Sequence, residues 1–391
     1  MADFEKVGDP SNLSRTPDVS LARTQNHHGL RPLMQRLKVA VLGAGGLVAQ
    51  RLQQRLSNHP WFTLAGVAGS PRYQGCALDD VPWILKEERP ELPELTVHDV
   101  ASEEHVKQLA EEGVTVAFSS LPSEQALLIE PMWAKAGITV FSNASAFRGH
   151  EGVPLVIPEV NGHALGTSQQ GNLRHACATN CTLLPLILPL AALHQRHELQ
   201  AYTMRSEQGL SGGGYEYMAA AMEHGSVDPV IPGEAEKTAA ELARVLGWQG
   251  EAKLRCERVM RADGHHVFVE ATFHTTVDED EVRAMLEAWS EERAMTHLPS
   301  APSRPLVLVN EIEPNLHLFA DGTGFPIAPN PATDLAAGMA VVVGGIECPT
   351  ANTVRFEAYS HNTIRGAAGG VIYLAELAHS MELLSSKTAH P

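Results

Sequence analysis

The sequence has 391 residues, of which 44% are hydrophobic and 19% are charged, as in folded globular enzymes, and this length suggests about two domains. A formal net charge of −17 at pH 7 argues against general nucleic-acid binding, because phosphate backbones require a surplus of lysine and arginine. The odd number of cysteines, five, argues against a secreted disulfide framework, and no second cysteine pair completes a zinc site. No apolar run reaches the ~18–20 residues of a membrane span. We therefore expect a cytoplasmic protein that binds no nucleic acid, membrane or metal, but that can hold a small anion in an arginine-lined cleft.

Residues 1–36 are expected to form a flexible tail, because they have neither hydrophobic periodicity nor the apolar core of a signal peptide. From Leu37 onward, LKVAVLGAGGLVAQRLQQRL predicts a short strand, a glycine turn and an amphipathic helix. Gly43 suits the tight turn, Gly46 lets the backbone approach a pyrophosphate at the helix N-terminus, and Ala49 suits close helix packing. The segment therefore predicts a dinucleotide site, with a purely structural turn as the alternative.

The next predicted strand, Phe62–Ala68, bears on the choice of cofactor. It is followed by Ser70 and Arg72, at a position where NAD enzymes usually place an acidic residue for the ribose 2′-hydroxyl. A hydroxyl and a guanidinium suit a 2′-phosphate instead. The pattern favours NADP, with a merely solvated Arg72 as the alternative.

Two more apolar strands, Thr115–Phe118 and Ile138–Phe141, alternate with helical stretches and predict a parallel α/β sheet. Ligands bind at the carboxyl edge of such sheets. The loop containing Ser120, Leu121 and Pro122 follows the first of these strands and is therefore expected at the cofactor.

The segment CATNCT, which contains Cys177, Asn180 and Cys181, precedes an apolar stretch that predicts a buried helix. A cysteine at a helix N-terminus is expected to have a lowered pKa, which favours the reactive thiolate. Asn180 and the neighbouring N–H groups suit the oxyanion of a tetrahedral intermediate. Local chemistry leaves open whether either cysteine reacts or both are small buried core residues.

From about Leu37 to Glu376 the sequence resembles the aspartate-semialdehyde dehydrogenase family, in particular its archaeal and fungal branch. The segments FSNASAFRGHEGVPLVIPEVN, CATNCT, QGLSGGGY and RVMRADGHHVFVE are similar to successive signatures of that branch. LPSAP and SHNTIRGAAG match its C-terminal motifs, and all of these segments occur in the family's order. The resemblance implies an α/β protein with a Rossmann dinucleotide-binding domain and an α+β catalytic and dimerisation domain. It also implies NADP as cofactor and assembly into a homodimer or homotetramer.

The resemblance also implies roles for individual residues. Cys181 would be the nucleophile, His265 the acid/base and Gln208 the residue that orients the acyl group. Arg148 would receive phosphate and Arg258 would bind the α-carboxylate of a small anionic amino-acid substrate. Two further substrate contacts are implied, Glu234 and Lys237.

The same resemblance, together with the glycine turn, defines an expected cofactor site. Asn362 is expected to contact the nicotinamide carboxamide. The residues expected to line this site are Gly43, Gly45, Gly46, Leu47, Ser70, Arg72, Ser120, Leu121, Pro122, Ser211, Gly212 and Asn362.

Several positions depart from the family pattern. Gly45 stands where the family's glycine turn has threonine, and the family's lysine is missing around Cys76, which weakens the preference for NADP. The nucleophile loop lacks a proline, and Cys177 creates a C-x-x-x-C spacing similar to that of glyceraldehyde-3-phosphate dehydrogenase, where the first cysteine reacts. The insertion around 316–329 has no counterpart to guide its interpretation.

We expect the NADP-binding domain to span 37–166 and to be completed by a C-terminal helix over about 360–385, with the catalytic and dimerisation domain over 167–359. The implied activity is the reductive dephosphorylation of L-aspartyl-β-phosphate through a cysteine thioester. Two alternatives remain open. One is a malonyl-CoA reductase that applies the same cysteine chemistry to a CoA thioester, and the other is a catalytically silent NADP-binding regulator.

Overall fold

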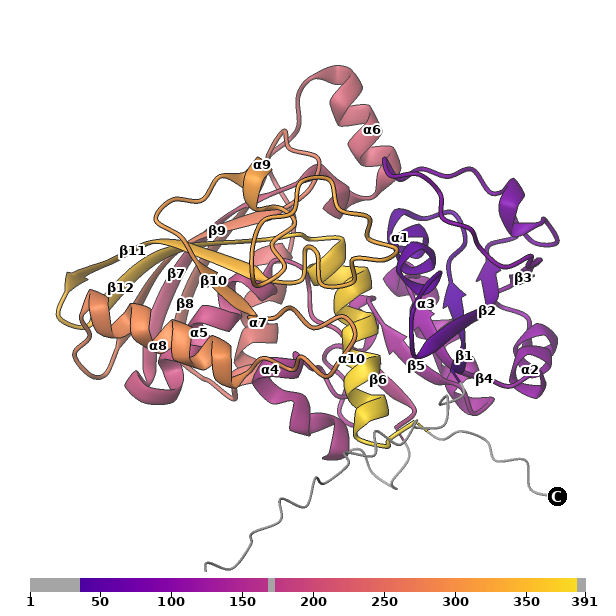
Figure 1. Ribbon diagram of the computed structural model, residues 1–391, viewed down its shortest axis with the longest axis horizontal. Helices are drawn as coiled ribbons and strands as arrows, with labels where there is room; N and C mark the ends of the chain where they lie inside the picture. Colours follow the sequence, from indigo (N-terminus) through magenta and orange to yellow (C-terminus); the bar gives the residue numbers. More distant parts are fainter. Residues whose placement is uncertain (1–35, 168–172, 385–391) are drawn as a thin grey trace, which may run out of the picture. The chain divides into compact units, whose positions relative to one another are not determined.

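The computed structural model describes residues 36–167 and 173–384, so the expected N-terminal tail lies, except for its last residue, outside the described residues. In this part of the chain two sheets lie side by side, one built from the earlier strands and one from the later strands (Figure 1). Among the described residues, no helix is both long and apolar enough to cross a membrane.

The first sheet is parallel throughout, as the alternation of strands and helices predicts. Its strands, in spatial order, are β3 (Val97–Asp99), β2 (Phe62–Gly69), β1 (Leu37–Leu42), β4 (Val114–Ser119), β5 (Thr139–Ser142) and β6 (His175–Cys177). The strand order reverses between β1 and β4, and in open α/β sheets the crevice at such a point receives the ligand.

Helices cover both faces of this sheet, which explains why its strands are almost continuously apolar. Helices α1 (Leu47–Leu56) and α10 (Gly369–Ser380) share one apolar cluster with it. On the opposite face, α2 (Glu103–Glu111) and α3 (Ser123–Lys135) contribute to a second cluster. The arrangement confirms the predicted Rossmann-type parallel sheet. The C-terminal helix α10 shares the apolar cluster of α1.

The parallel sheet extends beyond residue 166, where we expected the first domain to end. Its edge strand β6 pairs with β5 and lies directly before the nucleophile loop. The C-terminal helical region begins with a π-helical turn, Ile364–Ala368, that runs straight into α10. A boundary drawn at 166 therefore separates β6 from the sheet to which it belongs.

The second sheet is mixed. Its strands, in spatial order, are β10 (Leu306–Leu308), β11 (Val341–Thr350), β12 (Thr353–Ser360), β9 (His265–Phe273), β7 (Leu199–Gln208) and β8 (Glu251–Arg258). Three helices contribute to the apolar cluster on one face: α5 (Leu183–His197), α7 (Glu234–Leu246) and α8 (Glu279–Glu292). The opposite face carries a shallow depression of about 480 Å³, lined in part by Arg205, Phe268 and Arg355.

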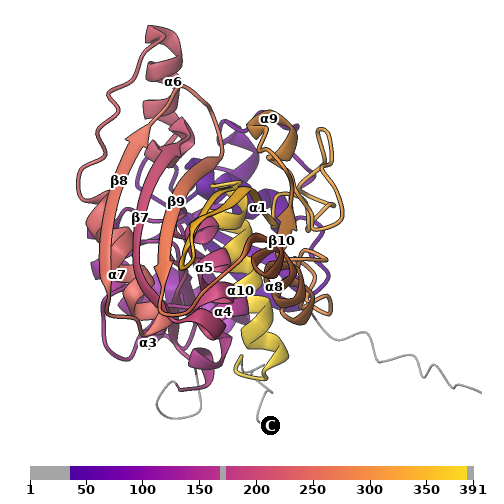
Figure 2. The ribbon, with the colours of Figure 1, turned by 90° about the vertical axis from the view of Figure 1, so that its left-hand side faces the viewer.

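Helix α6 (Tyr215–His224) projects from the rest of the described chain in both views (Figures 1 and 2). Ala221 is its one buried residue among the ten. It follows a glycine-rich turn at the end of β7, so the chain leaves the mixed sheet at the edge where β7 and β8 end and β9 begins.

Candidate active site

Cys181 lies between β6 and α5, and its Sγ is 3.1 Å from Nε2 of His265. Cys177 ends β6 and is fully buried in the apolar cluster around α5. Of the two cysteines in the C-x-x-x-C spacing, Cys181 is therefore the one beside an acid/base group. This geometry supports the choice of Cys181 over Cys177 that the resemblance implies.

Strand register brings three of the predicted residues into one row. Gln208, the last residue of β7, pairs with Arg258 at the end of β8 and with His265 at the start of β9. Arg258 donates to the carbonyl of Gly209 (2.8 Å), and the N–H of Gly209 donates to Nδ1 of His265 (3.2 Å). Gln208 donates to Ser206 at 3.2 Å. Residues 50 or more positions apart thus become neighbours through β-sheet pairing alone.

The expectation of a lowered cysteine pKa is wrong. Burial raises the pKa of Cys181 to about 12, and Glu234 adds to the rise. Arg148 and Arg258 act in the opposite direction but do not compensate. Burial also lowers the pKa of His265 to about 3, so both partners are neutral at pH 7. Burial dominates because removing a thiolate from water costs more than the two arginines and the backbone hydrogen bond at Cys181 return.

Two glycines make the close packing around the pair possible. A Cβ on Gly366, within the π-helical turn, would lie 2.5 Å from Cβ of Cys181. A Cβ on Gly212 would lie 2.8 Å from Nη1 of Arg258 and 3.3 Å from Cε1 of His265. The resemblance implies that Gly212 lies at the cofactor and gives no role to Gly366, although SHNTIRGAAG contains it. Neither contact leaves a signal in local sequence.

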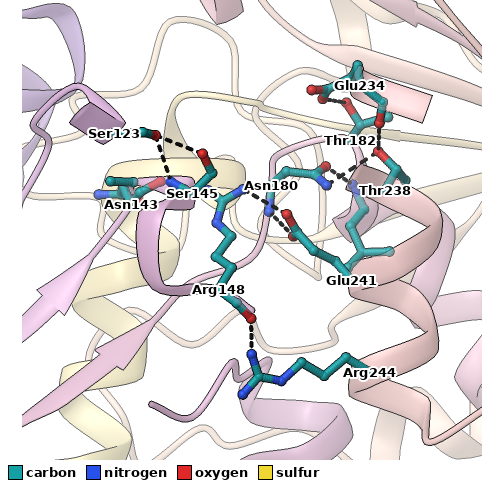
Figure 3. Close-up of polar contacts among 12 residues, drawn as sticks. Ser123, Asn143, Ser145, Arg148, Asn180, Thr182, Glu234, Thr238, Glu241 and Arg244 are labelled. Atoms are coloured by element: carbon teal, nitrogen blue, oxygen red, sulfur yellow. Dashed lines mark hydrogen bonds and ion pairs between the residues drawn. The ribbon is translucent and has the colours of Figure 1, made fainter. Parts of the chain in front are cut away.

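Hydrogen bonds of Asn180 hold the nucleophile loop in place. Its Oδ1 accepts the N–H of Leu183 at 2.9 Å, which caps the start of α5, and its Nδ2 donates to Thr238 at 3.3 Å. Its backbone N–H donates to Glu241 at 2.6 Å. The amide expected at the oxyanion thus has one N–H engaged elsewhere in this structure (Figure 3).

Arg148, the expected phosphate ligand, is held by a carboxylate that sequence analysis missed. Its Nη1 lies 2.9 Å from Glu241, and its Nη2 donates to the carbonyl of Asn143 at 2.6 Å. The side chains of Arg148 and Glu241 are only 11% and 8% exposed. Arg244 donates to the carbonyls of Arg148, His150 and Val153 and so fixes the loop that carries this arginine.

The two predicted substrate contacts on α7 differ in their surroundings. Glu234 accepts a hydrogen bond from Thr182, next to Cys181, at 3.2 Å. Lys237, three residues further on, is exposed. Glu234 is therefore part of the site as it stands, whereas Lys237 lies at its solvent side.

The glycine turn after β1 has the geometry that a dinucleotide requires. Gly43 has φ +114°, and a Cβ there would lie 2.7 Å from Oγ of Ser120, so glycine is required twice over. Ser120 itself donates to the carbonyl of Leu42 at 2.9 Å. Gly46 caps α1, and nothing lies within 4 Å of where its Cβ would be. An open cradle at a helix N-terminus suits a pyrophosphate.

The remaining residues expected at the cofactor follow β2 and β4 or begin α1. Ser70 and Arg72 are exposed just after β2, and Arg72 lies over the ring of Tyr73 at 5.1 Å. That ring also approaches Gly45, where a Cβ would lie 2.7 Å from it, so Tyr73 fills the space of the missing threonine side chain. Leu47 is the buried first residue of α1. Leu121 is buried, and Pro122 is the exposed residue that precedes α3.

Asn362 and Ser211 lie together, close to His265. Asn362 is 2% exposed, and its Nδ2 donates to Ser211 at 2.9 Å. Its Oδ1 accepts the N–H of Gly264, and Ser211 donates to Asp263, both at 2.7 Å. The Asn362 amide therefore joins the turn that leads into His265 to the turn that contains Ser211. One N–H of Nδ2 and one lone pair of Oδ1 remain for the expected contact with a nicotinamide carboxamide.

The comparisons with known proteins agree with this architecture. Residues 38–168 match the family model described as the NAD-binding domain of semialdehyde dehydrogenases. An aspartate-semialdehyde dehydrogenase of Archaeoglobus fulgidus is 33% identical over 88% of this chain and 98% of that protein. A malonyl CoA reductase (NADP) of Metallosphaera sedula is 29% identical over 88% of this chain and 97% of that protein.

A solved structure gives the same result. The crystal structure of aspartate semialdehyde dehydrogenase with NADP from Candida albicans matches with a TM-score of 0.74 and 26% identity, over 89% of this chain and 100% of that one. The chain belongs to the aspartate-semialdehyde dehydrogenase family.

Proposed function

We propose that this chain catalyses the NADP-dependent reductive dephosphorylation of L-aspartyl-β-phosphate to L-aspartate β-semialdehyde, a step of amino-acid biosynthesis toward lysine, methionine and threonine. The observation that carries the proposal is the 3.1 Å contact between Sγ of Cys181 and Nε2 of His265. In the mixed sheet, His265 and Arg258 both pair with Gln208. A nucleophile paired with an acid/base beside a buried arginine suits acyl transfer on an anionic substrate.

The proposed chemistry begins with a neutral pair. Because Nδ1 of His265 accepts the N–H of Gly209, the neutral ring carries its proton on Nε2 and donates it toward Sγ of Cys181. The sulfur attacks the acyl carbon, and the thiol proton leaves with the phosphate. As the carbon–sulfur bond forms, the bond to the phosphate oxygen breaks and phosphate leaves. After reduction, the carbon–sulfur bond of the hemithioacetal breaks and the aldehyde departs, while its hydroxyl proton passes to sulfur and Nε2–H of His265 stabilises the negative charge that develops there.

The glycine turn and the β2 loop fit the cofactor on the geometry described above. Gly43 and Gly46 would accept the pyrophosphate at the start of α1, and Ser70 and Arg72 would face the 2′-phosphate. When bound, NADPH supplies the hydride that reduces the thioester. Asn362 would contact the nicotinamide carboxamide, and its amide also holds the turn before His265.

Substrate recognition is proposed to rest on three charges. Arg258 would bind the α-carboxylate, Glu234 the α-ammonium and Arg148 the phosphate, with Lys237 at the open side of the site. Gln208 would orient the acyl group from the row that it shares with Arg258. The second N–H of the Asn180 amide, together with the backbone N–H groups at the start of α5, would stabilise the oxyanion.

We further propose that the parallel sheet with α1–α3 and α10 forms the cofactor domain and that the mixed sheet forms the catalytic domain. The open face of the mixed sheet, with its depression beside Phe268 and Arg355, is the proposed contact between subunits of a homodimer or homotetramer. The proposed location is the cytoplasm.

A second candidate substrate is malonyl-CoA, because a malonyl CoA reductase matches 88% of this chain. The two candidates differ at the α-carbon, since only the aspartyl substrate carries an ammonium. Glu234, half-buried beside Thr182, provides a partner for that ammonium. This contact favours the aspartyl substrate.

The test is reduction of NADP⁺ with L-aspartate β-semialdehyde and phosphate, compared with malonate semialdehyde and CoA, with NAD⁺ tested in parallel. We expect phosphate-dependent turnover of the aspartyl compound and its loss in Cys181→Ser. Turnover only with malonate semialdehyde and CoA would contradict the proposal and indicate a malonyl-CoA reductase. Binding of NADPH without turnover of either pair would favour a silent regulator.

A further inference from the structure

One face of α7 contacts both the nucleophile loop and the loop that carries Arg148 (Figure 3). Glu234, Thr238 and Glu241 follow one another at helical spacings of four and three residues, so they share this face. Arg244 continues it by three residues. From top to bottom, the contacts run from Thr182, through Asn180 and Arg148, to the carbonyls of residues 148–153.

Glu241 is the point where the two loops meet. Its Oε1 is 2.9 Å from Nη1 of Arg148, and its Oε2 accepts the backbone N–H of Asn180 at 2.6 Å. The carboxylate therefore joins the cation expected to receive phosphate to the residue directly before Cys181. Both ends of this bridge are shielded from water, where charge interactions are stronger than at the surface.

The backbone around Arg148 is fixed independently of this bridge. Arg244 donates to three carbonyls of the loop, and Asn143 accepts from the Arg148 guanidinium. The loop is therefore held in place without relying on Glu241. Nε of Arg148 is buried with no hydrogen-bond partner, so the donors of this guanidinium are not all used within the protein.

We propose that Glu241 is a positioning residue that limits the affinity of Arg148 for phosphate while keeping that arginine beside the nucleophile loop. An anion bound by Arg148 shares the cation with a carboxylate already 2.9 Å away, and the two negative charges repel each other. Arg148 thus stabilises the phosphate as it leaves the acyl group, and repulsion from Glu241 then favours dissociation of the phosphate from the site. This inference rests on the proposed function, because it takes Arg148 as the phosphate ligand.

The test uses Glu241→Gln, which removes the charge and keeps the shape and one acceptor for Asn180. With aspartate semialdehyde, we expect KM for phosphate to fall about fivefold or more, because the repulsion is gone, and kcat to fall because the product is released more slowly. Inorganic phosphate alone should also raise the unfolding temperature of this variant at lower concentrations than in the wild type. Glu236→Gln, which removes a charge from an exposed position on the same helix, is the matched control and should change neither quantity.

A double-mutant cycle separates this role from a structural one. In an Arg148→Met background, Glu241→Gln should change the affinity for phosphate much less, because phosphate is no longer held beside that carboxylate. An unchanged or raised KM for phosphate in Glu241→Gln, or an equal effect in both backgrounds, would overturn the inference while leaving the activity intact. If the wild type neither turns over phosphate nor binds it in the thermal titration, both the inference and the proposed function fail.

Discussion

The side chains around Cys181 and those along the cofactor edge differ in what holds them. Around Cys181, buried residues contact one another: His265 accepts from Gly209, Arg258 donates to the same residue, and Glu241 joins Arg148 to the nucleophile loop. Along the cofactor edge, Ser70 and Arg72 are exposed, and the space beside Gly46 is open. The acyl site is thus held by contacts among its own buried side chains. The residues expected to bind the cofactor make fewer contacts within the protein and are open to solvent.

This difference has a physical consequence. A fully packed site holds reacting groups in place before substrate arrives, and small displacements there are costly to rate. Substitutions at the open cofactor edge disturb few neighbouring residues and are expected to alter mainly the affinity for the cofactor. We therefore expect substitutions near Cys181 to lower kcat and those near the 2′-phosphate to raise KM.

The largest effect is expected from Gly366→Ala. The new methyl group would lie 2.5 Å from Cβ of Cys181 and 2.9 Å from its Cα, so the nucleophile must move. We expect kcat to fall about 100-fold or more, as for other ångström-scale displacements of reacting groups, with little change in the affinity for NADPH. Steady-state turnover and cofactor titration measure the two quantities.

Gly324→Ala is the matched control for that variant, because nothing lies within 4 Å of where its Cβ would be. It should retain wild-type turnover and stability. If Gly366→Ala also retained wild-type kcat, the account of a rigidly packed acyl site would be wrong.

A smaller effect is expected from Arg72→Ala at the open edge. Loss of the exposed guanidinium should raise KM for NADPH about tenfold, the scale of one charge-assisted hydrogen bond, and leave KM for NADH and kcat nearly unchanged. Kinetics with both cofactors provide the measurement. An equal rise for both cofactors would remove Arg72 from the 2′-phosphate site.

The elements that form the cofactor edge could be predicted from short segments of the sequence. The β1 strand, the turn at Gly43 and the start of α1 were predictable because one short segment carries the strand, the glycines and the amphipathic helix. The resemblance added Cys181 and His265, which the structure brings to 3.1 Å. No local pattern could have paired them, because 84 positions separate them.

The missed features depend on tertiary contacts. Glu241 is one more acidic residue on an amphipathic helix until the fold places Arg148 and Asn180 against it. The pKa of Cys181 was predicted in the wrong direction because the helix N-terminus is visible in sequence and the depth of burial is not. The limit of the first domain was placed before β6 because a three-residue strand carries too little pattern to be recognised.

The central claim is that Cys181 carries the acyl group, and the most direct test is to trap the thioester. The protein is incubated with L-aspartate β-semialdehyde and NADP⁺ without phosphate, quenched in acid, digested and sequenced by fragmentation mass spectrometry. The account predicts an aspartyl thioester on Cys181, an unmodified Cys177, and loss of the adduct when phosphate is added. An adduct on Cys177, or NADPH formation with Cys181 unmodified, would contradict it.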